Sequence, residues 1–226
     1  MNPTALISGL RFLDTFFPSG GYAYSSGLET AVQEGTVKTA DDLGSYVEDL
    51  FRHGIGPREA VAAARAHDAV TSTDLSLAFD VDRELDAMHT AAESRAASRQ
   101  MGRQVARHAT QLGNAVMRDF AVEVEADRTP GHLAVTLGLT LAAAGWPREQ
   151  AMAGLLYQHA VGFVSAGLKL LPMGQQDGQR LLAQWTRLID ELAAAATTEQ
   201  TMRAWTPVQD VYAMRHSRLR SRLFRS

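Results

Sequence analysis

The chain contains 226 residues, of which 46% are hydrophobic and 21% are charged, and none is a cysteine. This composition is typical of a globular protein with enough residues for a sizeable core, and the lack of cysteine excludes disulfides and thiolate metal sites. No run of about 18 apolar residues occurs, and no basic region followed by an apolar stretch opens the chain, so we expect neither a membrane span nor a secretory signal. A reducing cytoplasm is the simplest location.

The formal net charge of −3 is unevenly distributed along the chain. The last twelve residues contain no acidic residue and five arginines, Arg215, Arg218, Arg220, Arg222 and Arg225. Such a basic end is either a solvated, mobile tail or an arm that docks on an acidic surface. Charges of both signs are mixed over the rest of the chain, which argues against a nucleic-acid-binding body.

Apolar residues at helical spacing, with capping residues and helix breakers between them, predict the helices of the first half. Their ranges are 4–15, 25–33, 39–53, 57–70 and 74–88. Thr39 and Asp42 resemble a capping box at the start of the third helix. Gly54 is expected to end that helix, and Pro57 suits the first position of the fourth.

The second half of the chain is also predicted to be helical, over residues 91–120, 131–144, 147–171, 176–196 and 207–215. The helix over 147–171 is apolar nearly all round, which is typical of a helix at the centre of a bundle. Its glycines, Gly154, Gly162 and Gly167, lower its helix propensity, so we expect them to permit close helix packing.

These elements include no alternating strand pattern bounded by turns. We therefore predict an all-α protein with a single-domain bundle of roughly ten helices over residues 1–214. Residues 215–226 follow as a basic C-terminal arm that docks on a partner or on the body of the protein.

Four arginines, Arg95, Arg99, Arg103 and Arg107, follow one another at i+4 spacing in the predicted helix 91–120. Side chains at this spacing lie on one face of a helix. The stripe is either a solvated charged face or a face that receives an acidic neighbour.

The segment 14–29, DTFFPSGGYAYSSGLE, is the most informative stretch of the chain. Its two adjacent glycines allow backbone angles that a side chain forbids. Phe16, Phe17, Tyr22 and Tyr24 crowd around this turn. We interpret the segment as a defined loop with aromatic walls rather than as a spacer.

The motifs of several catalytic classes are missing. The sequence contains no GxxxxGK[ST] loop, no GxGxxG after a strand, no GxSxG elbow and no HExxH or HxH. None of the seven histidines lies three or four residues from another, so no helical chelate exists and each is expected to be a surface or hydrogen-bonded side chain. On the residues alone, we predict a protein that binds rather than reacts, with no catalytic, cofactor-binding or metal residues.

Three separated motifs resemble the UreF family of urease accessory proteins. They are FPSGGYAYSSGLE at 17–29 with Val-x-x-Gly-x-Val at 32–37, AESRAASRQMGR at 92–103, and LKLLPMGQQDGQRLL at 168–182 with PVQDVYAMRHSRLRSRLFRS at 207–226. Because the motifs occur in order and span nearly the whole chain, the resemblance is far more specific than one glycine turn.

The resemblance implies an all-helical, usually dimeric scaffold without enzymatic activity or a permanent cofactor. Such proteins bridge a scaffold subunit, UreD (also called UreH), and a GTPase, UreG, so that nickel enters apo-urease. Nickel would then be in transit, and neither nucleic acid nor a membrane would be a partner.

The resemblance also implies partner-binding residues in the first and last motifs. These are Pro18, Gly20, Gly21, Tyr22, Ser25, Gly27, Glu29, His216, Arg220, Arg222, Leu223 and Phe224. In the family the arm folds back and the arginine matching Arg222 lies near the aromatic residue matching Tyr22. A guanidinium stacked on a phenol ring stabilises such a contact by about 0.5 to 2 kcal/mol.

Two positions depart from relatives, some of which carry His at the position of Tyr24 and Glu at that of Ser217. His216 does match, and it is the one histidine that we consider as a nickel relay. Two alternatives remain open. One is a small-molecule-binding or regulatory all-α protein with the turn as a pocket lip, which a deep closed apolar pocket would favour. The other is an enzyme, which lacks support from any nucleophile–base spacing.

Overall fold

The computed structural model describes residues 1–225, and over this range it contains helices and no strand. The helices are α1 (Pro3–Leu13), α2 (Leu28–Gln33), α3 (Ala40–Leu50), α4 (Val61–Thr71), α5 (Leu75–Met88), α6 (Ala92–Ala109), α7 (Ala115–Glu125), α8 (Leu133–Ala143), α9 (Arg148–Leu170), α10 (Gln175–Thr198) and α11 (Pro207–His216). Two 3-10 turns, η1 (Gly21–Ala23) and η3 (Thr110–Leu112), and a π-helical segment, η2 (Phe51–Ala60), complete the set. The all-α prediction is confirmed. Ser226, the last residue of the predicted arm, lies outside the described residues.

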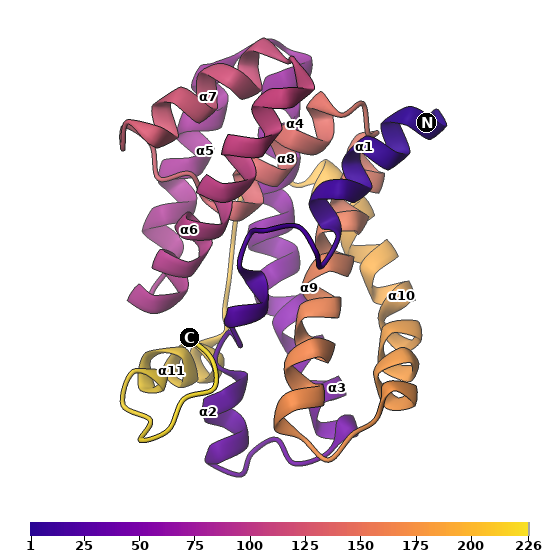
Figure 1. Ribbon diagram of the computed structural model, residues 1–226, viewed down its shortest axis with the longest axis vertical. Helices are drawn as coiled ribbons and strands as arrows, with labels where there is room; N and C mark the ends of the chain where they lie inside the picture. The colour runs from indigo at the N-terminus through magenta and orange to yellow at the C-terminus, as the bar shows by residue number, and fades with distance from the viewer. Residues whose placement is uncertain (226) are drawn as a thin grey trace.

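The helices form two groups that meet along α4, α8 and α9 (Figure 1). Helices α5, α6 and α7 pack around one end of α4 and α8, while α2, α3 and α10 pack against α9, and α11 packs against α2 and α6. Helix α8 is the most enclosed, because all of its residues from Leu133 to Leu141 are buried. The prediction that 147–171 is a central helix is confirmed, because α9 packs against α3, α4, α8 and α10, but this helix is less enclosed than α8. Helix α9 has one exposed face, on which Tyr157 is 52% exposed.

Helix α9 has 23 residues and a mean hydropathy of 1.2 in its most apolar stretch, so by length and composition alone it is able to cross a membrane. Half of that stretch is buried inside the protein. Central helices of globular proteins share these properties, because they too have no fully polar face.

Close helix packing depends on glycines at several crossings. A Cβ atom on Gly138 of α8 would lie 2.2 Å from the carbonyl oxygen of Ala63 in α4, and one on Gly167 would lie 2.5 Å from Leu43 Cδ2. Gly154 is similarly close to Leu13. The packing role predicted for Gly154 and Gly167 is thus confirmed, but that predicted for Gly162 is wrong within this chain, because a Cβ there meets nothing within 4 Å.

The predicted break between Gly54 and Pro57 does not occur. Instead, η2 carries the helix from α3 into α4 without interruption, with Pro57 inside it. Proline has no N–H and leaves the carbonyl four residues earlier without its helical donor. The structure supplies a replacement, since the N–H of Trp205 donates to the carbonyl oxygen of His53 at 2.7 Å, and the N–H of Arg203 donates to that of Pro57 at 3.1 Å. A distant linker therefore allows the wide π turn to persist.

The predicted helix 91–120 is two helices. Helix α6 ends in η3, Gly113 adopts φ = 74°, and Asn114 caps α7 by accepting from the N–H of Met117 at 3.1 Å. Glycine in a left-handed conformation followed by an Asn cap is a strong helix boundary. Apolar periodicity on both sides of Gly113 obscured it.

The arginine stripe of α6 receives acidic neighbours from its own chain. Arg99 Nε donates to Asp86 at 2.9 Å, Arg103 pairs with Asp127, and Arg107 pairs with Glu125. Arg95 donates to the carbonyl oxygen of His89. The side chains of these ion pairs remain partly exposed to solvent. Three of the four arginines are therefore neutralised by carboxylates although the stripe lies at the surface.

A buried carboxylate that the sequence did not reveal orders the entry to α8. Asp82 is fully buried and accepts from Thr129 Oγ1 at 2.6 Å, from the N–H of Gly131 at 2.6 Å and from the N–H of His132 at 2.9 Å. Three donors satisfy the carboxylate, as a buried charge requires. The turn before the most buried helix is thereby fixed to α5.

Gly138→Ala is expected to lower the free energy of unfolding by about 2 kcal/mol, because overpacking against the α4 backbone outweighs the gain in helix propensity. Gly162→Ala is the matched control. In the monomer it should raise the free energy of unfolding by about 0.5 to 1 kcal/mol, since it relieves a helical glycine and its Cβ meets no described atom of the chain within 4 Å. Urea unfolding followed by circular dichroism measures both, and equal stability of the two variants would contradict the described α4–α8 crossing.

Candidate functional site

The glycine turn projects two aromatic side chains into solvent. Phe16 is 95% exposed and Tyr22 is 73% exposed, whereas Phe17 turns inward and packs with its ring centroid 5.2 Å from that of Phe12. Gly20 adopts φ = 82° immediately before η1, a conformation that glycine reaches without strain. The turn is a defined loop, as predicted, but its aromatic residues face both ways.

The C-terminal arm is held by one buried carboxylate. Glu29 of α2 is 2% exposed. Its Oε1 accepts from the N–H of Leu223 at 2.7 Å, and its Oε2 accepts from the N–H of Phe224 at 3.1 Å. Hydrogen bonds to a buried charged acceptor are among the strong ones in proteins. Residues 221–225 of the arm therefore lie against the body, so this part of the chain is not a solvated tail.

His216, at the end of α11, joins two carboxylates. Its Nε2 lies 2.9 Å from Glu29 Oε2, and its Nδ1 lies 3.2 Å from Glu93 Oε2 at the start of α6. The ring therefore joins α2 to α6 through a hydrogen bond at each nitrogen. Glu93 also faces Arg222, at 4.0 Å. A polar network thus runs from α2 through α11 and α6 to the arm.

Additional contacts fasten the arm and α11 to the first motif. Arg225 N–H donates to the carbonyl oxygen of Ala23 at 2.7 Å, and Gln33 Nε2 donates to that of Ser221 at 3.0 Å. Phe224 is buried beneath the ammonium of Lys169, which is 5.2 Å from the ring centroid. Two segments that are about 190 residues apart in the chain, as the spacing of Glu29 and Leu223 shows, form one surface.

Gly27 permits the approach of α11 to α2. It adopts φ = 82°, and a Cβ there would lie 3.0 Å from the backbone nitrogen of Ala213. Larger residues would be strained by the conformation and would push α11 away. The glycine is therefore required by the docking of the last helix.

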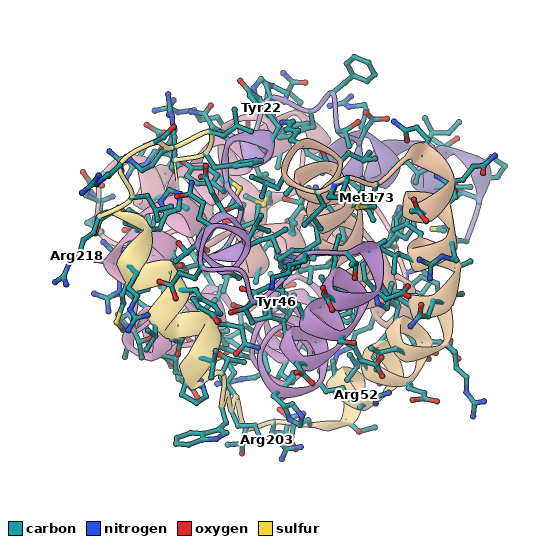
Figure 2. All side chains as sticks on the ribbon, turned by 90° about the horizontal axis from the view of Figure 1, so that it is seen from below. Tyr22, Tyr46, Arg52, Met173, Arg203 and Arg218 are labelled. Carbon is teal, nitrogen blue, oxygen red and sulfur yellow. The ribbon has the colours of Figure 1, made fainter. Side chains whose placement is uncertain are left out.

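The expected contact between Arg222 and Tyr22 is absent from the described residues, and this correction has a physical reason. The Arg222 guanidinium faces the carboxylate of Glu93, which attracts a cation more strongly than a ring does. Tyr22 remains mostly exposed at the edge of the molecule (Figure 2).

The structure brings together some of the predicted site residues and not others. Four of them meet at one place, which we call the clasp: Glu29, His216, Leu223 and Phe224. Ser25 is buried beside the clasp, where its Oγ accepts a hydrogen bond from the Glu29 N–H at 3.4 Å. Pro18, Gly20 and Gly21 shape the turn, which contacts the arm through Ala23. Arg220 is exposed, and Figure 2 shows the neighbouring Arg218 pointing into solvent. The role of all these predicted residues in binding partners stays a prediction.

A partly open hollow of about 170 Å³ lies under the turn. Its apolar walls are Leu13, Phe17, Tyr22, Tyr24, Met101, Val161, Phe163 and Phe224. Gly162 lies at its exposed rim. A second groove, of about 450 Å³, separates α3 from α11 and has Asp42, Asp49 and the exposed Trp205 among its lining residues. Neither is the deep closed apolar pocket that the small-molecule hypothesis requires.

A third pocket, of about 120 Å³ and also partly open, lies next to the hollow and shares His159 and Phe163 with it. Arg58 donates twice to Glu59 Oε1 at its wall, at 2.9 and 2.7 Å. Glu59 Oε2 and His89 Nε2 are buried and have no hydrogen-bond partner among the described residues. Buried polar atoms without partners are rare, so these two mark a place where a polar species is accommodated.

Burial controls the protonation of this pocket. It lowers the pKa of His89 to about 4 and lowers that of His159 below its ordinary value, because a charged imidazolium is poorly solvated there. Burial alone raises the pKa of Glu59, but the Arg58 charge and its hydrogen bonds outweigh this and leave that pKa below its usual range. At neutral pH the pocket therefore contains an ionised carboxylate near neutral imidazoles.

Sequence reasoning missed Glu93, Glu59 and His89 as site residues. Glu93 lies inside the motif AESRAASRQMGR at 92–103, so the joint occurrence of this motif and the terminal motif was an available signal. No sequence signal pointed to Glu59 and His89, because they are 30 residues apart and belong to different elements, η2 and the end of α5. Within residues 1–225 no group of three or more His, Asp or Glu side chains is placed to hold a metal ion.

The fold and the site together define an all-α protein whose basic arm is held against its own first motif. Comparison with known proteins agrees. The UreF family model matches residues 37–186. Urease accessory protein UreF of Dechloromonas aromatica (strain RCB) is 35% identical over 96% of this chain and 96% of its own, and that of Agrobacterium fabrum (strain C58 / ATCC 33970) is 34% identical over 98% and 96%. The same-named protein of Bacillus sp. (strain TB-90) is 26% identical over 98% and 99%. The chain belongs to the UreF family of urease accessory proteins.

Glu29→Gln is expected to release the arm. The amide NH₂ of glutamine would replace one acceptor oxygen and face a donor, which costs about 1.5 to 3 kcal/mol at a buried site. Hydrogen exchange of the Leu223 and Phe224 amides should accelerate by roughly 10- to 100-fold.

The matched control for this variant is Glu34→Gln, which removes a half-exposed ion pair with Arg215. Surface pairs contribute about 1 kcal/mol or less, so exchange should change by less than about fivefold. Equal protection of the arm amides in both variants would show that Glu29 does not hold the arm.

The stability of the protein is expected to fall with pH in part through His89. Its pKa is about 4 in the folded protein, against an ordinary value of 6.5, so over this interval the unfolded chain binds a proton that the folded chain does not. This contribution is intact above pH 6.5 and is lost as the pH falls through the interval, to a total of about 3 kcal/mol.

Urea unfolding of wild type and His89→Gln above and below this interval tests the prediction. The fall in stability should be smaller in the variant by up to about 3 kcal/mol. A fall remains in both proteins, because burial also lowers the pKa values of His67, His132 and His159. An identical pH dependence would contradict the burial of His89.

Proposed function

We propose that this protein is a nickel-insertion chaperone of urease maturation and has no catalytic activity of its own. In this proposal it acts in the cytoplasm as a homodimeric adaptor between a UreD/UreH-type scaffold and a UreG-type GTPase, and the assembly loads nickel into apo-urease. Membership of the UreF family supports the general role. The single observation that carries the adaptor role is the ordered arm, clasped by Glu29 and presenting its arginines outward.

The arm offers uncompensated positive charge to a partner. Among the described residues Arg215 pairs with Glu34 and Arg222 faces Glu93, whereas Arg218, Arg220 and Arg225 form no ion pair. Three free guanidinium groups on one ordered arm favour a partner with acidic side chains, and such complementarity accelerates association.

An apolar strip adjoins these charges. It consists of Trp205, Val208, Val211 and Met214, which are 79%, 55%, 40% and 47% exposed. Interfaces commonly combine an apolar centre rich in Trp and Met with a charged rim. The outer face of α11 and the arm together therefore have the composition of a protein-binding surface.

Nickel is proposed as cargo, and the pocket that contains Glu59, His89 and His159 is the part of the chain suited to it. His89 and His159 are neutral there, and imidazole and carboxylate groups are suitable ligands for Ni²⁺. The partnerless Glu59 Oε2 and His89 Nε2 support a passing polar species in this place. His216 is less suited while the arm is docked, because both of its ring nitrogens face carboxylates.

Capture of the UreG-type GTPase on the immobilised complex of this protein with its UreD/UreH-type partner tests the adaptor role. Arg222→Ala and deletion of residues 215–226 should reduce capture by at least about tenfold, as loss of interface charge does. Arg187→Ala is the matched control, because Arg187 is 91% exposed on α10, away from the arm, and capture should be unchanged. Undiminished capture by both arm variants would overturn the docking role of the arm.

A further inference from the structure

We propose that two copies of this chain pair through the hollow under the glycine turn, with Phe16 of each copy inserted into the hollow of the other. The proposal rests on the homodimer of the proposed function and adds to it the surface, the inserted residue and the part that the arm plays.

The projecting residue and the hollow belong to the same short segment. Phe16 is 95% exposed, while its neighbours Thr15 and Phe17 line the hollow. A two-fold axis beside this segment brings each Phe16 to the hollow of the other copy, as an isologous interface requires. Among the large hydrophobic side chains of the described residues, Phe16 is the most exposed.

The size and walls of the hollow suit one aromatic side chain. It measures about 170 Å³ and is walled by residues such as Leu13, Met101 and Phe163. An apolar cavity of about 150 Å³ is large enough to hold benzene. Drug-sized ligands occupy about 300 to 1,000 Å³, so a single ring is the better fit.

Gly162 supplies an independent indication. It lowers the helix propensity of α9, yet no atom of this chain approaches the position of its Cβ within 4 Å, and it lies at the rim of the hollow. At Gly154 and Gly167 the same helix uses glycine for close packing. A partner copy that approaches the backbone at Gly162 gives the third glycine the same purpose.

The near absence of charged side chains around the hollow favours a second copy of this chain as its occupant. Asp14 is the only Asp, Glu, Lys or Arg among the residues that line the hollow. A surface that meets itself across a two-fold axis opposes like charges, and a nearly neutral surface avoids this cost. The arm surface, with its arginines, cannot meet itself in this way and is left for an acidic partner.

The arm also completes the hollow, because Phe224 forms part of its wall and Glu29 holds the Phe224 amide. Docking of the arm and pairing of the two copies are therefore coupled. Release of the arm removes one wall of the site that receives Phe16, so an undocked arm should weaken the dimer.

Sedimentation velocity over a concentration series, on the full chain, tests the proposal. Phe16→Ser removes both inserted rings, and Gly162→Leu places a branched side chain at the rim of both hollows, where a Cβ meets no described atom within 4 Å. Each should weaken the dimer by roughly a hundredfold, as loss of two buried anchors does. Trp205→Ser, which removes another exposed aromatic ring that lies outside the hollow, should leave the dimer unchanged. Glu29→Gln should weaken it by about tenfold through the arm.

Mixing the two variants separates insertion from general disturbance. A mixed dimer of Phe16→Ser with Gly162→Leu retains one intact insertion, so the mixture should associate more tightly than either variant alone. Circular dichroism confirms that each variant is folded.

A monomeric wild type, or wild-type affinity in both variants, or no gain on mixing, would overturn the proposal. These results are distinct from those for the adaptor role. Dimerisation that survives Phe16→Ser, with GTPase capture still dependent on Arg222, would reject this interface and leave the adaptor proposal standing.

Discussion

The buried carboxylate of Glu29 is the interaction on which the functional surface depends. It accepts hydrogen bonds from two consecutive amides of the arm and faces the ring of His216. With the arm docked Glu29 is only 2% exposed, so the two arm amides supply the hydrogen bonds that water would otherwise make. Burial of Glu29 and ordering of the last residues therefore occur together. The basic end is positioned by the body, and its outer arginines are displayed at a defined place.

The same logic recurs at the other end of the molecule. Asp82 orders the turn before α8 by accepting from three donors, and the free carbonyl of His53 opposite Pro57 is satisfied by the linker before α11. In each case one polar group inside the core fixes a segment that is distant in sequence. Hydrophobic burial holds the helices together, while these groups select the register in which the loops and the arm return.

The surface of the protein separates into regions with different chemistry. The face around the turn is apolar and nearly neutral, with a hollow and a projecting phenylalanine, which suits pairing with an identical surface. The face of α11 and the arm is apolar and basic, which suits a different and acidic partner. Phe224 contributes to the first region and is held by Glu29, so the arm links the two. The proposed adaptor role requires this separation of surfaces.

The sequence by itself determined the helical class, most helix positions and the family. Periodicity and capping are local properties, so α1, α5, α8 and α10 follow from them within a few residues. It also identified the two motifs that form the clasp, but only as separate segments. Where the local signals were ambiguous, as at Gly54, Pro57 and Gly113, the expected boundaries were wrong, because a distant backbone donor or a single left-handed glycine decided them.

Only the tertiary structure decided that Glu93 rather than Tyr22 faces Arg222, that α8 rather than α9 is the most enclosed helix, and that Glu59 and His89 share a pocket. These outcomes depend on which helices meet and at what depth. Burial and the partners of a polar group are properties of the packed chain, and no spacing along the sequence records them.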